Sequence, residues 1–167
     1  MFTAQFLLEK IPLTWTDLLW GYEKQFFGWR LPTEIANARL KTTPSFNALE
    51  FELAGVQKDQ DWKVGRLLGA LSKQESVPES VSQERWLYVT LLRLYENQGS
   101  TADTLRRIEE VYADFDYPVE IISFVNFMAP TALSDGWDSS VHTVLENQNQ
   151  MVKRWKDYLD RTRPRFS

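Results

Sequence analysis

One histidine and no cysteine among 167 residues leave few routes to nucleophilic or metal chemistry. Without cysteine the chain cannot form a disulfide, a thiolate zinc site, an iron–sulfur cluster or a thiol nucleophile. His142 has no second histidine to share a metal or a relay, and the sequence contains no Gly-x-Ser-x-Gly elbow. Because Val141, Val144 and Leu145 flank His142, we expect it to have a structural role in a packed helix.

Paired carboxylates are the remaining option for acid–base or metal chemistry. The pairs Asp59-x-Asp61 and Asp114-x-Asp116 lack the further oxygen ligands and the glycine that a calcium loop needs at fixed offsets. A spacing of two also separates side chains on a helix, where neighbours are three or four residues apart. We therefore expect Asp59 or Asp61 to cap a helix, and the second pair to form a turn.

Nucleotide binding has no motif to support it. Residues 65–69, GRLLG, lack the Gly-Lys-Ser/Thr end of a phosphate loop and do not match the dinucleotide fingerprint. Gly65 and Gly69 lie four residues apart on one side of a predicted helix, which indicates a close helix approach instead. We predict no catalytic residue, no metal ligand and no cofactor, and therefore a protein that is not an enzyme.

Charge is distributed unevenly. The chain has 19 Lys and Arg against 23 Asp and Glu, a net charge of −4. Residues 96–120 hold seven acids and two bases, whereas residues 153–167 hold six bases and two acids. Such runs are most often solvated helix faces, and a net acidic chain is a poor general binder of nucleic acid. No apolar run reaches the roughly 20 residues of a membrane span. We expect neither nucleic acid nor membrane as a partner.

The elements that position these residues are predicted to be helices. Apolar residues recur every three to four positions along most of the chain, which predicts an all-α protein of eight helical segments. The segment from Trp86 to Tyr95 is apolar on nearly all sides, and the last helix is the longest, from Ser139 to Arg161. Two architectures fit: an irregular multi-helix bundle or a short helical-hairpin solenoid, each with a long C-terminal helix. We expect one helical domain over residues 1–160 and a frayed, basic C-terminal tail over residues 161–167.

Caps and breakers predict where several helices begin. Thr14 is an expected N-cap, and Gly21 inside the same helix indicates a packing constraint. Ser45 is an expected cap for a third helix, although residues 51–54 could also form a short strand. The polar residues 72–83 form the most evident loop.

A helix beginning at Ser100 or Thr101 is predicted to have one apolar and one charged face. The side chains of Leu105, Ile108 and Phe115 point inward on this pattern, and a further helix opens at Tyr117-Pro118. The acidic face is the expected surface for a protein partner, and it comprises Asp103, Glu109, Glu110, Asp114 and Asp116.

Seven tryptophans are many for a chain of this length. Most are expected in the core, because a tryptophan buries a large area and its indole N–H needs only one partner. A tryptophan or tyrosine exposed beside acids would favour protein binding, since aromatic anchors supply affinity and charge steers the encounter.

Three stretches carry a resemblance to a known family. Residues 13–23 (LTWTDLLWGYE) with 29–32 (WRLP), residues 111–118 (VYADFDYP), and residues 155–159 (WKDYL) resemble a bacterial family catalogued as domain of unknown function twenty-two forty-seven. The resemblance spans roughly Leu13 to Leu159. It implies a small helical protein with no assigned catalytic residue. Family members often lie beside secreted polymorphic toxins, which implies an immunity role for some of them.

From the resemblance and the charge pattern we expect a non-enzymatic bacterial immunity protein. It would act in the cytoplasm, which the absence of cysteine favours, and bind a cognate toxin as its protein partner. Its acidic face could mimic phosphates toward a nuclease toxin with a basic cleft. The alternative is a helical adaptor or scaffold, which predicts a groove lined by exposed tryptophan or tyrosine. A carboxylate-only enzyme would need a cleft that holds two carboxylates around one water or metal.

Overall fold

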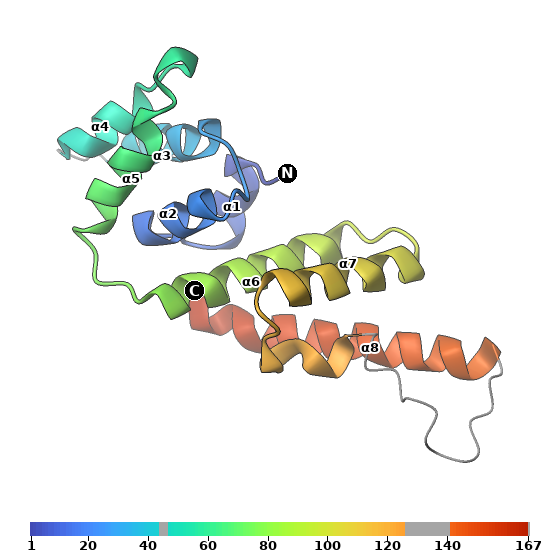
Figure 1. The fold of residues 1–167 in the computed structure, drawn as a ribbon. Coiled ribbons are helices and arrows are strands. Elements are labelled where there is room, and N and C mark those ends of the chain that lie inside the picture. The colour runs from blue at the N-terminus through green and yellow to red at the C-terminus, as the bar shows by residue number, and fades with distance from the viewer. Residues whose placement is uncertain (44–46, 126–140, 167) are drawn as a thin grey trace. The chain divides into compact units, whose positions relative to one another are not determined.

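The computed structural model describes residues 1–43, 47–125 and 141–166, with the side chains of 141–145 outside that description. Within these ranges every regular element is an α-helix or a 3-10 helix and there is no strand, so the all-α prediction is confirmed (Figure 1). None of the described helices combines the length and apolar character that a membrane span requires. The predictions for Ser45 and for the side chain of His142 fall outside the described residues.

The chain divides into two compact units, Met1–Trp86 and Leu87–Ser167, and the expected single domain over 1–160 stays a prediction. In the first unit α2 packs against α5, and α3 packs against α4 and α1 (Figure 1). This unit contains α1 (Ala4–Lys10), α2 (Trp15–Glu23), α3 (Arg30–Thr42), α4 (Ala48–Ala54), η1 (Lys58–Gln60), α5 (Lys63–Ser72) and the beginning of α6 (Glu79–Glu96).

Helix α2 packs on α5, and its predicted start is confirmed. The Thr14 hydroxyl accepts a hydrogen bond from the Asp17 N–H, and the Asp17 carboxylate accepts one from the Thr14 N–H, so the two form a capping box. A Cβ added at Gly21 would lie 2.6 Å from the Trp86 ring and 2.8 Å from the Phe27 ring. Glycine is therefore required where α2 meets Trp86, as the sequence indicated.

Within residues 47–69, the helix expected through Phe51 is confirmed and its strand alternative is not, whereas the expected cap at Asp59 or Asp61 is wrong. Asp59 lies in η1 and Asp61 follows it, but α5 begins after Trp62 with no side-chain cap. Asp61 and Trp62 both have helical dihedral angles, so the 3-10 turn runs directly into α5 and leaves no extended residue to act as an N-cap. Residues 51–54 are helical, because Asn47 caps α4 through the Leu49 N–H.

The glycine pair in α5 marks no close helix approach. A Cβ at Gly69 would meet nothing within 4 Å, and one at Gly65 would make only an ordinary contact, 3.5 Å from the Tyr22 ring. Glycine in a helix is less stable than alanine by up to about 1 kcal/mol, so packing does not explain either residue.

The second unit is built around the end of α6 and the long helix α8. It contains the rest of α6, α7 (Thr101–Asp114), η2 (Val119–Phe124), α8 (Val141–Thr162) and η4 (Arg163–Phe166). Trp155 of α8 is fully buried, and its ring lies edge-on to Tyr95 with 5.0 Å between centroids. Helix α8 also packs on η2 (Figure 1). The predicted long C-terminal helix is confirmed.

Two sequence expectations for the second unit need correction. The helix expected after Tyr117-Pro118 is the 3-10 helix η2 as far as Phe124, and residues 126–140 lie outside the described ranges. The expected frayed tail forms η4 instead, where Phe166 is only 8% exposed and its ring lies 5.5 Å from that of Tyr88. Burial of this one aromatic side chain explains why the basic residues before it are ordered.

Candidate functional site

The carboxylate of Asp17 is fully buried and has a complete set of hydrogen-bond partners. It accepts from the Thr14 N–H at 2.7 Å, from the Ser82 hydroxyl at 2.6 Å and from Nη1 of Arg85 at 2.7 Å. The indole N–H of Trp86 donates to the main-chain oxygen of Asp17 at 2.7 Å. Because every partner belongs to the protein itself, Asp17 joins α2 to α6 and is not available to a ligand.

A second carboxylate closes the N-terminus of α2. Glu75, from the loop between α5 and α6, accepts from the N–H groups of Trp15 and Thr16 at 3.1 and 2.8 Å, and from the Thr16 hydroxyl at 2.9 Å. An anion at this position satisfies the unpaired N–H groups and suits the positive end of the helix dipole. Residues 72–83, predicted as a loop, thus contain a side chain that holds the beginning of α2 in place.

Arg39 completes this polar network. Its guanidinium lies over the Trp15 ring, 4.4 Å from the centroid, and donates to the main-chain oxygen of Leu13. Burial lowers the pKa of Arg39 below its ordinary value, and the nearby carboxylates Glu50, Glu75 and Asp17 oppose that shift. The motif at residues 13–23, which carries part of the family resemblance, therefore has a structural role. Among the described residues no group of three or more acids and histidines could hold a metal ion.

The charged face of α7 differs from that network in both exposure and pairing. Ser100 caps the helix by accepting from the Asp103 N–H, and Leu105 and Ile108 are buried as predicted. The structure places Asp103, Glu110, Asp114 and Asp116 at the surface and leaves Glu109 half-buried. It does not bring the five predicted partner-binding residues into one uniform patch, because two arginines interrupt the beginning of the face.

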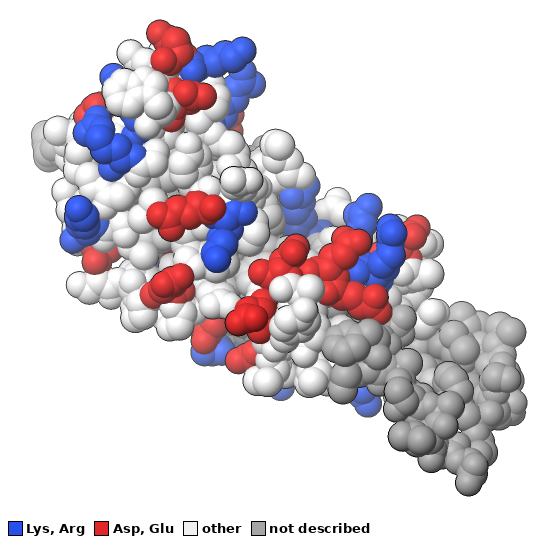
Figure 2. Space-filling view, viewed as in Figure 1, with Lys and Arg blue, Asp and Glu red and all other residues white. Residues whose placement is uncertain are grey.

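Arg106 and Arg107 divide the face into two parts. They lie three and four residues after Asp103, so the beginning of α7 has charges of both signs. Beyond them lie four acids, which we call the acidic end of α7 and which gather visibly in Figure 2. The acidic end of α7 comprises Glu109, Glu110, Asp114 and Asp116.

The acidic end of α7 is not explained by helix stability. The last turn of α7 contains no basic residue, and acids there oppose the negative end of the helix dipole. Within the described part of the chain, none of these four carboxylates is within ion-pair distance of a basic group. The charge is therefore available to a partner molecule.

The turn that follows α7 is a Schellman motif without its usual glycine. The N–H of Tyr117 donates to the Tyr112 oxygen at 2.9 Å, and the N–H of Asp116 donates to the Ala113 oxygen at 3.2 Å. Asp116 and Tyr117 have φ angles of 59° and 58°, in the left-handed region that favours glycine. The turn predicted for Asp114-x-Asp116 is confirmed, and it keeps two side chains where glycine would be more stable.

Exposed apolar side chains continue from this turn into η2. Tyr117 is 59% exposed, and its ring stands edge-on to Tyr112 with 5.3 Å between centroids. Val119 and Ile122 are also exposed. We call these three residues the apolar step, and the sequence analysis did not identify them. The prediction of a new α-helix opening at Tyr117-Pro118 obscured them, because the segment is the 3-10 helix η2.

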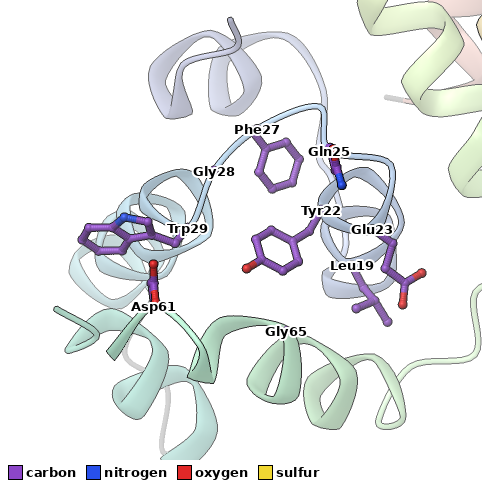
Figure 3. Close-up of a pocket in the computed structure, with 9 residues that line it drawn as sticks. All are labelled: Leu19, Tyr22, Glu23, Gln25, Phe27, Gly28, Trp29, Asp61 and Gly65. Carbon is purple, nitrogen blue, oxygen red and sulfur yellow. The ribbon is translucent and has the colours of Figure 1, made fainter. Parts of the chain in front are cut away.

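A hollow in the first unit is the second candidate site (Figure 3). It has a volume of about 570 Å³, within the usual range for ligand pockets of roughly 300–1,000 Å³. The residues that line it are Leu19, Tyr22, Glu23, Gln25, Phe27, Gly28, Trp29, Asp61 and Gly65. The adaptor alternative predicts a groove lined by exposed tryptophan or tyrosine, whereas Tyr22 and Trp29 line this hollow and are half-buried.

The tryptophans divide as the sequence suggested. Trp15, Trp20, Trp86 and Trp155 are buried, while Trp62 is 69% exposed. The Trp62 ring lies 5.6 Å from the ammonium group of Lys63, which is a cation–π distance. Burial of four of the described tryptophans confirms that this residue type mainly builds the core.

The basic C-terminal segment uses part of its charge within the second unit. Lys156 donates to Asp160 at 2.8 Å, and this hydrogen bond raises the pKa of Lys156. Arg154 donates to the main-chain oxygen of Ser123 at 3.0 Å, which joins α8 to η2. These contacts favour a structural role for the basic segment.

Comparison with known proteins and families gives a match at the level of a family. No curated protein and no solved structure matches it. A family model described as "uncharacterized protein conserved in bacteria (DUF2247)" matches residues 4–163, which is nearly the whole chain and includes both units. The chain therefore belongs to this bacterial family, as the sequence resemblance indicated.

Proposed function

We propose that this protein binds a basic protein partner through the acidic end of α7, and that it serves as a cytoplasmic immunity protein against a cognate toxin. One observation carries the proposal: four carboxylates without a described ion-pair partner lie directly before an exposed apolar step. Surfaces that combine an aromatic anchor with unpaired charge of one sign are typical of protein interfaces.

The two parts of this surface would contribute differently to binding. Carboxylates attract a basic partner over a distance and raise the association rate, whereas burial of Tyr117 and its apolar neighbours slows dissociation. A stable complex would bury about 800 Å² on each partner. A toxin that acts on nucleic acid fits best, because its basic cleft is complementary to closely spaced carboxylates.

The immunity role rests on the family resemblance, and a non-enzymatic role has support from the first unit. There, Asp17 and Glu75 are occupied by hydrogen bonds from the protein itself. These hydrogen bonds give both carboxylates a structural role in joining α2 to residues 75–85. The alternative function, a helical adaptor or scaffold, is favoured by the hollow of Figure 3.

Native mass spectrometry of the chain, co-expressed with an inactivated product of the neighbouring gene, tests the proposal. We expect a one-to-one complex that weakens as salt is added, because exposed charge pairs are screened. The charge-reversing pair Glu110→Lys and Asp114→Lys should lower the association rate about 10- to 100-fold at low salt and much less at high salt.

A matched control separates the surface from net charge. The pair Asp59→Lys and Asp157→Lys changes the net charge equally, and both residues are exposed outside α7. We expect this control to keep an association rate within about threefold of the original at moderate salt, since long-range attraction is screened. An equal loss in both double variants, or no complex at all, would remove the acidic end of α7 from the mechanism.

A further inference from the structure

The hollow in the first unit has the chemistry of a cation site. We propose that it binds the guanidinium group of an arginine side chain presented by a partner polypeptide. This inference concerns residues of Met1–Trp86 only and does not depend on the acidic end of α7.

Aromatic rings form the apolar walls of the hollow. Figure 3 shows the rings of Tyr22 and Phe27 pointing into the space between Gly28 and Gly65, and the centroids of these two rings lie 6.3 Å apart. The Tyr22 hydroxyl points toward the side where Trp29 and Asp61 lie (Figure 3). Tyr22 is only partly exposed, so a planar group that enters the hollow would stack on its ring and lose water.

The charged groups that line the hollow are all negative. Asp61 and Glu23 contribute carboxylates, and no lysine or arginine lines it. Neither carboxylate is within ion-pair distance of a basic group in the described ranges. Rings and unpaired carboxylates together attract an organic cation, through the ring faces and through charge-assisted hydrogen bonds.

A guanidinium fits this combination better than an ammonium group. It is planar, stacks on aromatic faces and donates two parallel hydrogen bonds to one carboxylate. At the Trp29 ring, which lines the hollow, the Arg30 guanidinium already makes such a contact, 5.5 Å from the ring centroid. Arg30 covers the Trp29 ring and Phe27 is buried against the Trp86 ring, so the partly exposed ring of Tyr22 is the one on which a ligand can stack.

Gly65 keeps the hollow open. A Cβ there would lie 3.5 Å from the Tyr22 ring, an ordinary contact, so a side chain is tolerated but would extend along the wall. Gly69, one turn later in α5, has open space around it and does not line the hollow. The two glycines therefore give a matched pair, in which only the first substitution fills the site.

Titration calorimetry with a capped Gly-Arg-Gly peptide tests the proposal on the full chain. We expect binding of this peptide and none of the same peptide with citrulline, which has the shape of arginine without its charge. Asp61→Asn should weaken binding about three- to tenfold and Glu23→Gln somewhat less, because Glu23 points away along α2 in Figure 3. Gly65→Leu should abolish binding.

Two controls and one competing ligand make the result decisive. Asp59→Asn removes a charge two residues from Asp61 without touching the hollow, and Gly69→Leu adds the same side chain elsewhere on α5. Both should bind like the original chain. Equal binding of the citrulline peptide, no binding of the arginine peptide, or tighter binding of free agmatine than of the peptide would each overturn the proposal. If Gly65→Leu fails to fold, the comparison of Asp61→Asn with Asp59→Asn decides.

Discussion

Carboxylates serve opposite purposes in the two units of this protein. Around α2, Asp17 and Glu75 each accept three hydrogen bonds from the chain and join segments that are about 60 residues apart in sequence. At the end of α7, Glu110 and Asp114 are exposed and accept none from a basic group in the described residues. The difference shows that acid content alone does not locate a site, whereas pairing and burial do.

Both sets of acids lie near helix ends, where their electrostatic effect has opposite sign. Glu75 lies at the positive N-terminal end of α2 and stabilises it, while Asp114 is the last residue of α7, at the negative end. The acids at the end of α7 oppose the helix dipole, and no basic residue in the last turn offsets them, so they lower the stability of the helix. A residue that lowers stability in this way is a candidate for a functional role.

The largest expected effect on stability comes from replacing Asp17 with alanine. Asp17→Ala leaves Arg85 without its buried partner and deprives Ser82 and the α2 cap of their acceptor, so the free energy of unfolding should fall by about 3–5 kcal/mol. Urea unfolding followed by circular dichroism measures the loss.

Asp103 is the matched control, because it occupies the corresponding third position of α7 but is exposed. Asp103→Ala should lower the free energy of unfolding by no more than about 1 kcal/mol. Similar losses in the two variants would show that burial does not distinguish the two acids.

Local sequence signals predicted local features well. Thr14, Ser100 and the apolar stripe of α7 depend only on residues within a few positions, and their predictions are confirmed. The partners of Asp17 could not be predicted, because Ser82 and Arg85 lie 65 and 68 residues away in a stretch with no distinguishing pattern.

The wrong predictions have separate physical causes. Asp59 and Asp61 have the right residue type for a cap, but the dihedral angles that η1 imposes prevent it. The tail was predicted to fray because it is rich in basic residues. Phe166 instead packs on the ring of Tyr88 and holds the segment in place. For the candidate site, periodicity predicted that most of the acids are exposed, but the half-burial of Glu109 and the apolar step needed the structure.

Replacement of Glu75 should have a smaller effect than that of Asp17, because Glu75 is only partly buried. Glu75→Ala removes the acceptor for two N–H groups of α2, and the free energy of unfolding should fall by about 1–2 kcal/mol. Glu110→Ala is its counterpart in α7 and should change stability by less than about 0.5 kcal/mol, or raise it slightly. Thermal unfolding of both variants measures the contrast, and a loss from Glu110→Ala equal to that from Glu75→Ala would break it.

The smallest effect is the most informative, because it should separate stability from binding at one residue. Asp116 has a φ of 59° at the glycine position of the Schellman turn, so Asp116→Gly should raise the free energy of unfolding by roughly 0.5–1 kcal/mol. The same change removes one carboxylate from the acidic end of α7 and should lower the association rate with the partner a few-fold at low salt. Asp116→Asn tolerates the left-handed backbone without the charge, so it should reproduce the loss of rate with little gain in stability. If Asp116→Gly is more stable and binds as fast as the original chain, then Asp116 is not part of the binding surface, and the comparison between the two sets of acids must rest on Glu110 and Asp114 alone.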